Sequence, residues 1–97
     1  MQIEITGHHL DITDALRAHV GRRLARINGL QAPRHLHAVL NVDKKRHICD
    51  LMTRLEGEEF VARGEDDDMY AAIDRAAEKM ERQLQSAKGR KTPRRGR

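Results

Sequence analysis

The N-terminal residues alternate between apolar and polar positions. Over residues 2–6, Ile3 and Ile5 fall on one face of an extended chain and the three polar side chains fall on the other. This two-residue period is typical of a half-buried strand, and Gly7 is expected to end it.

A helix is predicted to begin after Thr13. Threonine is a good N-cap residue because its hydroxyl accepts a hydrogen bond from a backbone N–H of the first turn. The apolar residues that follow recur at spacings of four, four and three, which places them on one face of the helix: Leu16, Val20, Leu24 and Ile27. Asn28 and Gly29 form the expected C-terminal stop.

Three strands in an antiparallel meander are predicted for the middle of the chain. Apolar and polar residues alternate over 36–42 and again over 49–55, on either side of the basic stretch 44–47. If both apolar sets face one core, Asp43 lies opposite Ile48 across a four-residue hairpin loop. Gly57 allows a second tight turn into a strand over 59–63, where Phe60 and Ala62 continue the inward face.

The last helix has the clearest period. Acidic residues 66–68 are N-cap candidates, which the helix macrodipole favours at that end. Seven apolar residues then cluster on one side of a helical wheel: Met69, Ile73, Ala76, Ala77, Met80, Leu84 and Ala87. The predicted order β-α-β-β-β-α gives an α+β fold, a four-stranded sheet with both helices on one face. Residues 1–88 are expected to form the domain, and residues 89–97 a basic disordered tail.

Composition narrows the function classes. No apolar run approaches the ~18 residues of a membrane span, so no membrane partner is predicted. Aromatic residues make up 2% of the chain, which disfavours proteins that stack several bases on exposed rings. A single cysteine forms no internal disulfide, and the N-terminal residues lack the pattern of a secretory signal. A cytoplasmic location is therefore expected.

Charge is unevenly distributed along the chain. The formal net charge is +4, from 19 basic and 15 acidic residues. Six of the basic residues lie in 88–97, which contain no acid, so residues 1–87 hold 13 basic and 15 acidic residues, a balance of −2. A binding site for a polyanion on the folded part therefore requires segregated charge.

Both predicted helices show such segregation on a helical wheel. In the first helix, His19 shares one flank with three arginines, Arg22, Arg23 and Arg26. In the second helix, Arg75, Lys79 and Arg82 lie on one flank, and Asp74, Glu78 and Glu81 on the other. Solvated faces with intrahelical ion pairs are one explanation. Two cationic flanks on the same side of a sheet, with a basic loop and tail, also fit a surface for phosphate backbones.

No catalytic or metal-binding pattern emerges. The six histidines lack zinc-ligand spacing, and the acidic run 65–68 lacks the alternation of a calcium loop. Cys49 falls at an inward strand position and is expected to be a buried, inert thiol. The chain is thus predicted to be no enzyme and to bind no metal, cofactor or small-molecule substrate.

Three stretches of the sequence resemble one family. They are Ile5-Thr6-Gly7 with residues 12–17 (Ile-Thr-Asp-Ala-Leu-Arg), His47 with Asp50, and residues 68–74 (Asp-Met-Tyr-Ala-Ala-Ile-Asp). These stretches resemble the bacterial ribosome hibernation promoting factors, also called ribosome-associated inhibitors or sigma-54 modulation proteins. The resemblance extends over residues 1 to about 88, and the stretch 68–74 is its most specific part.

The resemblance implies a fold similar to double-stranded-RNA-binding domains. It also implies docking in the messenger and transfer RNA channel of the small ribosomal subunit in stationary phase, where basic residues of both helices contact ribosomal RNA. The positions that match the family's basic pattern are Arg23, Arg26, Lys79, Arg82 and Lys88. Arg22 and Arg75 are added from the helical wheel alone.

Alternatives remain within and beyond this family. The long form carries a C-terminal dimerisation domain that 97 residues are too few to hold, so the chain resembles the short form, which promotes pairing of ribosomes with help from a separate modulation factor. A related single-domain type has a longer tail that opposes pairing, and the short basic tail over residues 88–97 favours the pairing-promoting type. A sigma-factor-binding transcription modulator is the alternative function. It would not need two cationic flanks, and its binding would depend less on salt. A small hydrolase that uses the histidines lacks a nucleophile–base pair.

Overall fold

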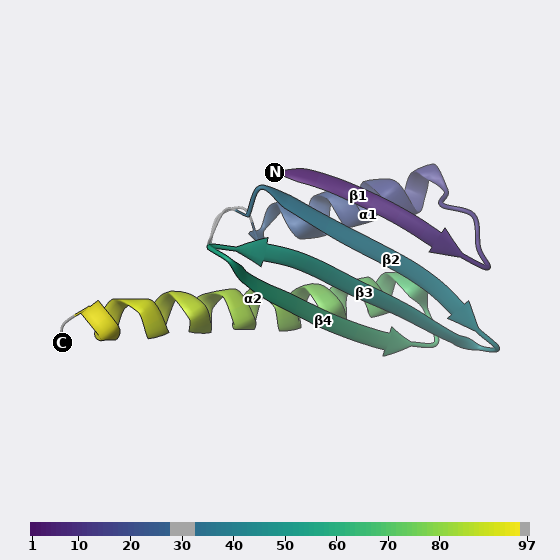
Figure 1. Cartoon of the computed structure of the whole chain (residues 1–97). Coiled ribbons are helices and arrows are strands. Elements are labelled where there is room, and N and C mark those ends of the chain that lie inside the picture. Colours follow the sequence, from purple (N-terminus) through teal and green to yellow (C-terminus); the bar gives the residue numbers. More distant parts are fainter. Residues whose placement is uncertain (28–32, 96–97) are drawn as a thin grey trace.

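The chain folds into one four-stranded sheet covered on one face by two helices (Figure 1). The computed structural model describes the backbone of residues 1–27 and 33–95 and the side chains of residues 1–27 and 33–87. The element order is β1 (Gln2–His8), α1 (Asp14–Ala25), β2 (His35–Asp43), β3 (Arg46–Leu55), β4 (Glu58–Asp66) and α2 (Met69–Arg95). The predicted α+β order β-α-β-β-β-α is confirmed.

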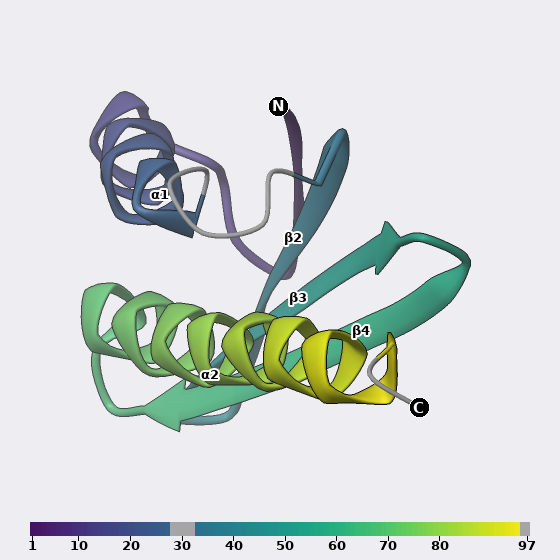
Figure 2. The ribbon, with the colours of Figure 1, turned by 90° about the vertical axis from the view of Figure 1, so that its left-hand side faces the viewer.

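The strands lie in the sheet in chain order. β1 pairs with β2 in parallel, whereas the pairs β2–β3 and β3–β4 are antiparallel. The parallel pair is possible because the connection between the two strands contains α1, which runs back from the end of β1 toward its start. Figure 2 shows α1 and α2 on the same side of the sheet, and within residues 1–27 and 33–95 no helix or strand covers the other face. β1 and β4 form the two edges.

The strand β1 is longer than the alternation predicted. It continues to His8, and Gly7 pairs with Leu40 inside the ladder. The glycine serves close packing: a Cβ on Gly7 would lie 2.7 Å from the carbonyl oxygen of Leu10 and 2.9 Å from Cδ1 of Ile12. The chain therefore turns back tightly over the end of β1 without ending the strand at Gly7.

The hairpin between β2 and β3 is tighter than expected. Asp43 pairs with Arg46 across a two-residue turn, and not with Ile48 across four residues. Lys44 takes φ 60°, a left-handed conformation that reverses the chain in fewer residues. The register shifts by two residues, so every side chain keeps the face that the alternation assigned to it. At the next hairpin, Glu56 and Gly57 both have positive φ, as a tight turn requires.

Both helices present the predicted apolar stripes to the sheet. Thr13 caps α1, because its Oγ1 accepts a hydrogen bond from Leu16 N–H at 3.1 Å. All apolar residues assigned to the two helix stripes are buried, and they pack on inward residues of β2, β3 and β4. The proposed stop at Asn28 and Gly29 lies outside the described residues.

The second helix extends further than expected. Its backbone is helical to Arg95, beyond the expected domain boundary at residue 88. The side chains of residues 88–95, including Lys88, lie outside the described residues, as do residues 96 and 97. No helix in the described part of the chain is long and apolar enough to cross a membrane.

Candidate nucleic-acid interface

The edge strand β4 and helix α2 are joined by side chains that reach across from the helix. Lys79 Nζ donates a hydrogen bond to the carbonyl oxygen of Arg63, and Gln83 Nε2 donates one to that of Val61, both at 2.8 Å. Four residues along a helix span about 6 Å, close to the span of two residues along a strand, so the spacing matches. Lys79 is therefore held beside β4 and still has two ammonium donors free to point outward.

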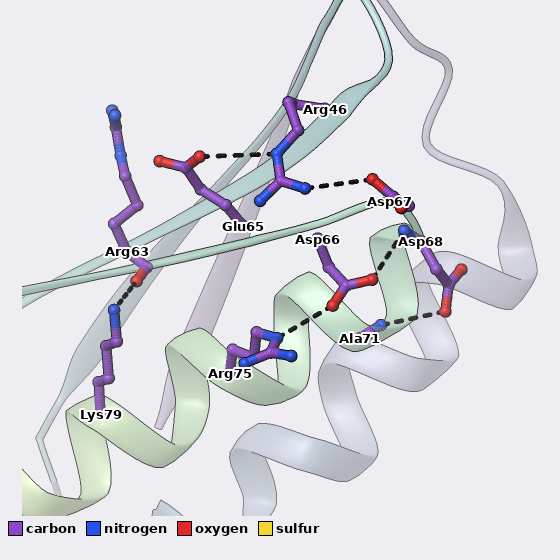
Figure 3. A network of polar contacts seen from close by, with 9 residues as sticks. All are labelled: Arg46, Arg63, Glu65, Asp66, Asp67, Asp68, Ala71, Arg75 and Lys79. Atoms are coloured by element: carbon purple, nitrogen blue, oxygen red, sulfur yellow. Dashed lines mark hydrogen bonds and ion pairs between the residues drawn. The ribbon is translucent and has the colours of Figure 1, made fainter.

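The start of α2 is fixed by an acidic network. Asp68 Oδ2 accepts from Ala71 N–H at 3.2 Å, which makes Asp68 the N-cap among the three candidates (Figure 3). Asp66 belongs to β4, and its Oδ1 accepts from Asp68 N–H. Its other oxygen accepts from Arg75 Nε at 3.0 Å. This hydrogen bond from Arg75 holds the pKa of Asp66 below its ordinary value, and Asp66 in turn orients the exposed guanidinium of Arg75.

Three of the predicted basic residues meet around one hollow. It has a volume of about 380 Å³, and its lining consists of Arg63, Glu65, Arg75, Glu78, Lys79 and Arg82. Arg75, Lys79 and Arg82 come from the flank of α2 that the helical wheel identified. Arg82 is exposed and has no ion pair among the described residues. We call this group of four cations, Arg63, Arg75, Lys79 and Arg82, the edge surface.

Arg63 is a cation that the sequence analysis missed. Its guanidinium binds Asp50 of β3 through two hydrogen bonds, of 2.7 and 3.0 Å, and these raise the pKa of Arg63 further. The register that places Asp50 opposite Arg63 is a cross-strand pairing. Alternation predicted an outward Arg63, but no local signal placed it beside the basic flank of α2.

Two of the three acidic residues on the other flank of α2, Asp74 and Glu81, contact α1. Arg23 Nη1 donates to Glu81 Oε2 at 2.5 Å and Arg23 Nε lies 3.6 Å from Asp74 Oδ1. His19 Nε2 lies 2.8 Å from the same Asp74 oxygen, and its ring packs edge-on against Tyr70. The side chains of Arg23 and Glu81 are only 14% and 17% exposed. Arg23 therefore links the two helices. The sequence placed Arg23 on a flank for binding a ligand, but its charge is paired with acidic residues of α2.

The remaining basic residues of α1 stay exposed. Arg22 and Arg26 have no ion pair within the described part of the chain. Arg26 lines a second hollow of about 450 Å³ between the outer sides of the helices, together with Arg23, Ala71, Asp74, Arg75 and Glu78. The hollow beside Arg26 therefore adjoins the hollow of the edge surface, because Arg75 and Glu78 line both.

The other chemical candidates form no site. Among the described residues, no three histidine, cysteine, aspartate or glutamate side chains lie close enough together to hold a metal ion. Cys49 is buried, and its burial, with the nearby charge of Asp50, raises the pKa of its thiol to about 12. The prediction of a buried thiol is confirmed, and a thiol with this pKa is a poor nucleophile at neutral pH.

Together, the sheet covered on one side and the cations gathered along its β4 edge define a class of small α+β domain with a segregated cationic surface. Residues 3–92 match the family described as Sigma 54 modulation protein / S30EA ribosomal protein. The chain belongs to this family, as the sequence resemblance predicted.

Relatives and solved structures agree with that assignment. The chain is 41% identical over 85 residues to the ribosome hibernation promoting factor of Salmonella typhimurium, covering 87% of this chain and 90% of the relative. It is 39% identical over 90 residues to that of Azotobacter vinelandii, covering 87% and 79%. Two solved structures share the fold. The N-terminal domain of Thermus thermophilus Protein Y has a TM-score of 0.82 at 35% identity, covering 89% of this chain and 98% of that one. A ribosomal subunit interface protein of Coxiella burnetii has a TM-score of 0.85 at 33% identity, covering 92% and 99%.

Proposed function

We propose that this protein binds the small ribosomal subunit and promotes ribosome hibernation. The names of its relatives, ribosome hibernation promoting factor and ribosomal subunit interface protein, support the ribosome as the partner. The observation that carries the proposal is the edge surface, whose four cations surround one hollow. Three of them are held by hydrogen bonds before any ligand arrives, so they lose less entropy on binding than free side chains would.

The proposed ligand on the ribosome is the phosphate backbone of ribosomal RNA. A-form grooves offer little sequence to read, so shape and phosphate contacts dominate recognition of folded RNA. We propose Arg75, Lys79, Arg82 and Arg63 as contacts from the edge surface and Arg22 and Arg26 as contacts from α1. Arg23 is proposed to act indirectly, because its side chain is only 14% exposed and lies between the helices, whereas the paired arginines Arg63 and Arg75 stay exposed. Lys88 remains a proposed contact from the family pattern.

The finer proposal is that the protein occupies the channel of messenger and transfer RNA. A small domain that binds there would exclude both and keep the subunit inactive without chemistry. In this proposal the protein works in the cytoplasm in stationary phase, and a separate modulation factor assists the pairing of ribosomes.

Co-sedimentation with purified small subunits tests the proposal. Each phosphate neutralised releases condensed counterions, so the seven proposed contacts would give a slope of roughly −5 to −6 in log affinity against log salt. Labelled initiator transfer RNA should be displaced as the protein is titrated onto the subunit. An affinity that does not change with salt would contradict the electrostatic contact and favour the sigma-factor alternative. Full simultaneous binding of protein and transfer RNA would place the site outside the channel.

A further inference from the structure

The two edges of the sheet are protected differently. At the β4 edge, Lys79 and Gln83 donate hydrogen bonds to outward carbonyl groups, so part of that edge is occupied by helix side chains. An exposed strand edge offers unpaired N–H and C=O groups to any extended chain, and proteins usually block it. The opposite edge is β1, and the question is whether it is blocked in the same way.

The backbone of β1 directs alternate residues to its free side. Gln2 N–H donates to the carbonyl oxygen of Arg34 at 2.8 Å, so the even residues of β1 pair with β2. Ile3 and Ile5 therefore point their N–H and C=O groups away from the sheet. Across the described residues, 1–27 and 33–95, no backbone group pairs with these two residues on that side. This short stretch is an open edge.

A hollow of about 450 Å³ follows the open edge. It is lined by residues 2–5 together with Arg17 of α1 and His35 of β2. The partly buried side chains of Ile3 and Ile5 face the core side, where Arg17 also lies. Glu4 faces the uncovered side of the sheet; it is 60% exposed and its Oε1 lies 3.3 Å from His35 Nε2. The edge thus has an apolar side with a cation and a polar side with an anion.

A second copy of β1 fits this edge poorly in the two registers that use both Ile3 and Ile5 within the strand. Antiparallel self-pairing centred on Glu4 would place two carboxylates directly opposite each other, at the closest cross-strand distance. Centring on Ile5 would require Gly7 as a pairing residue, and Leu10 and Ile12 pack against that end of the strand. The occupant that fits is a different strand, with apolar residues on the core side and a basic residue opposite Glu4.

We propose that the β1 edge is a docking site for a basic extended segment of a protein partner, which adds to the sheet as a fifth strand. The ladder to Ile3 and Ile5 would supply affinity, and the cation opposite Glu4 would supply selectivity. Arg17 would reject a basic residue on the core side, so the segment must alternate between apolar and basic or hydroxyl residues. The site lies across the sheet from the edge surface and does not depend on binding of RNA.

Synthetic peptides test the proposal on the intact protein. The probe is a capped peptide of sequence Thr-Val-Lys-Val-Thr-Val, and the control peptide carries Glu in place of Lys. The peptide concentration is about 1 mM, because a short flexible strand loses entropy on binding and therefore binds weakly. The lysine peptide should slow hydrogen exchange of the Ile3 and Ile5 amides about tenfold. The Gln2 and Glu4 amides already pair with β2 and should change little.

Two variants make the test specific. Glu4→Lys should reverse the preference, so that the glutamate peptide binds and the lysine peptide does not. Ile5→Pro removes an outward N–H that β2 does not use, and it should abolish binding of both peptides while circular dichroism stays unchanged. Lack of protection by either peptide, or a Glu4→Lys protein with the original preference, would overturn the proposal. So would concentration-dependent dimerisation that protects Ile3 and Ile5 without peptide, because it would assign the edge to self-pairing.

Discussion

Gly64 is the point where β4 and α2 approach most closely. A Cβ on this residue would lie 2.2 Å from the carbonyl oxygen of Ala72 and 2.5 Å from the backbone nitrogen of Ala76. Both atoms belong to the helix backbone, so the clash cannot be relieved by a side-chain rotation. The small residue is what allows α2 to lie against β4 and its cations to surround one hollow.

Gly64→Ala should therefore lower the free energy of unfolding by about 1–3 kcal/mol, the usual cost of overpacking. Gly21→Ala is the matched control, because Gly21 lies inside α1 and a Cβ there meets no atom within 4 Å. That change should stabilise the protein by about 0.5–1 kcal/mol, since alanine favours helix. Urea denaturation of both variants measures the difference. A neutral Gly64→Ala would contradict the close contact.

Asp66 predicts a pH dependence at the same junction. The hydrogen bond from Arg75 lowers the pKa of Asp66 below 3.8. A carboxyl whose pKa is lowered on folding stabilises the fold above its unfolded value and loses that contribution as pH falls through the folded value. Asp66→Asn should thus be less stable than wild type at neutral pH, and the two should converge below pH 3.8. Urea midpoints across that range test this, and a constant gap would assign the effect to something other than Asp66 ionisation.

At the scale of elements, α1 and α2 are connected by charge as well as by apolar packing. Arg23 and His19 of α1 meet Asp74 and Glu81 of α2 in one connected group. The two exposed arginines beside it, Arg22 and Arg26, face outward. Neighbouring arginines of one helix therefore have different roles, one between the helices and two towards solvent.

This division predicts opposite outcomes for Arg23→Ala and Arg26→Ala. Loss of Arg23 leaves Glu81 and Asp74 without their guanidinium partner and should reduce stability by about 1–3 kcal/mol. Loss of Arg26 should change stability by less than about 0.5 kcal/mol and weaken binding to the small subunit about fivefold, equivalent to ~1 kcal/mol. Thermal unfolding and co-sedimentation separate the two effects. Equal losses of stability would show that the helices do not use Arg23 as described.

At the scale of the whole molecule, some cations lie on helix turns that pack against the sheet, whereas those near the C-terminus lie beyond it. Figure 1 shows the last turns of α2 continuing past the end of the sheet, where no strand lies beneath them. The triple change of Arg26, Lys79 and Arg82 to Ala should weaken subunit binding roughly 100-fold, at ~1 kcal/mol per contact. Deletion of residues 89–97 should cost less, because the last turns of α2 have no strand beneath them to fix their position before binding. The reverse order, in salt-matched co-sedimentation, would move the interface to the C-terminal segment.

Much of the fold follows from the sequence because it depends on local geometry. Period two at Ile3 and Ile5 and the seven-residue apolar set of α2 each determine an element and the face it buries, and Thr13 determines where α1 begins. These outcomes depend on backbone sterics and on burial of apolar side chains, which act within a few residues. The flank that carries Arg75, Lys79 and Arg82 was predictable for the same reason.

Only the tertiary structure decided which residues of different elements lie opposite each other. The register of Asp43 with Arg46, the pairing of Asp50 with Arg63 and the placement of Glu81 against Arg23 all join residues on different elements. Alternation leaves a two-residue shift undetected because it keeps every side chain on the same face. A helical wheel likewise shows which residues share a flank but not which element that flank faces. The sequence therefore shows which residues carry charge. Which of these charges are paired within the protein, and which stay available to a ligand, depends on the packing of the whole chain.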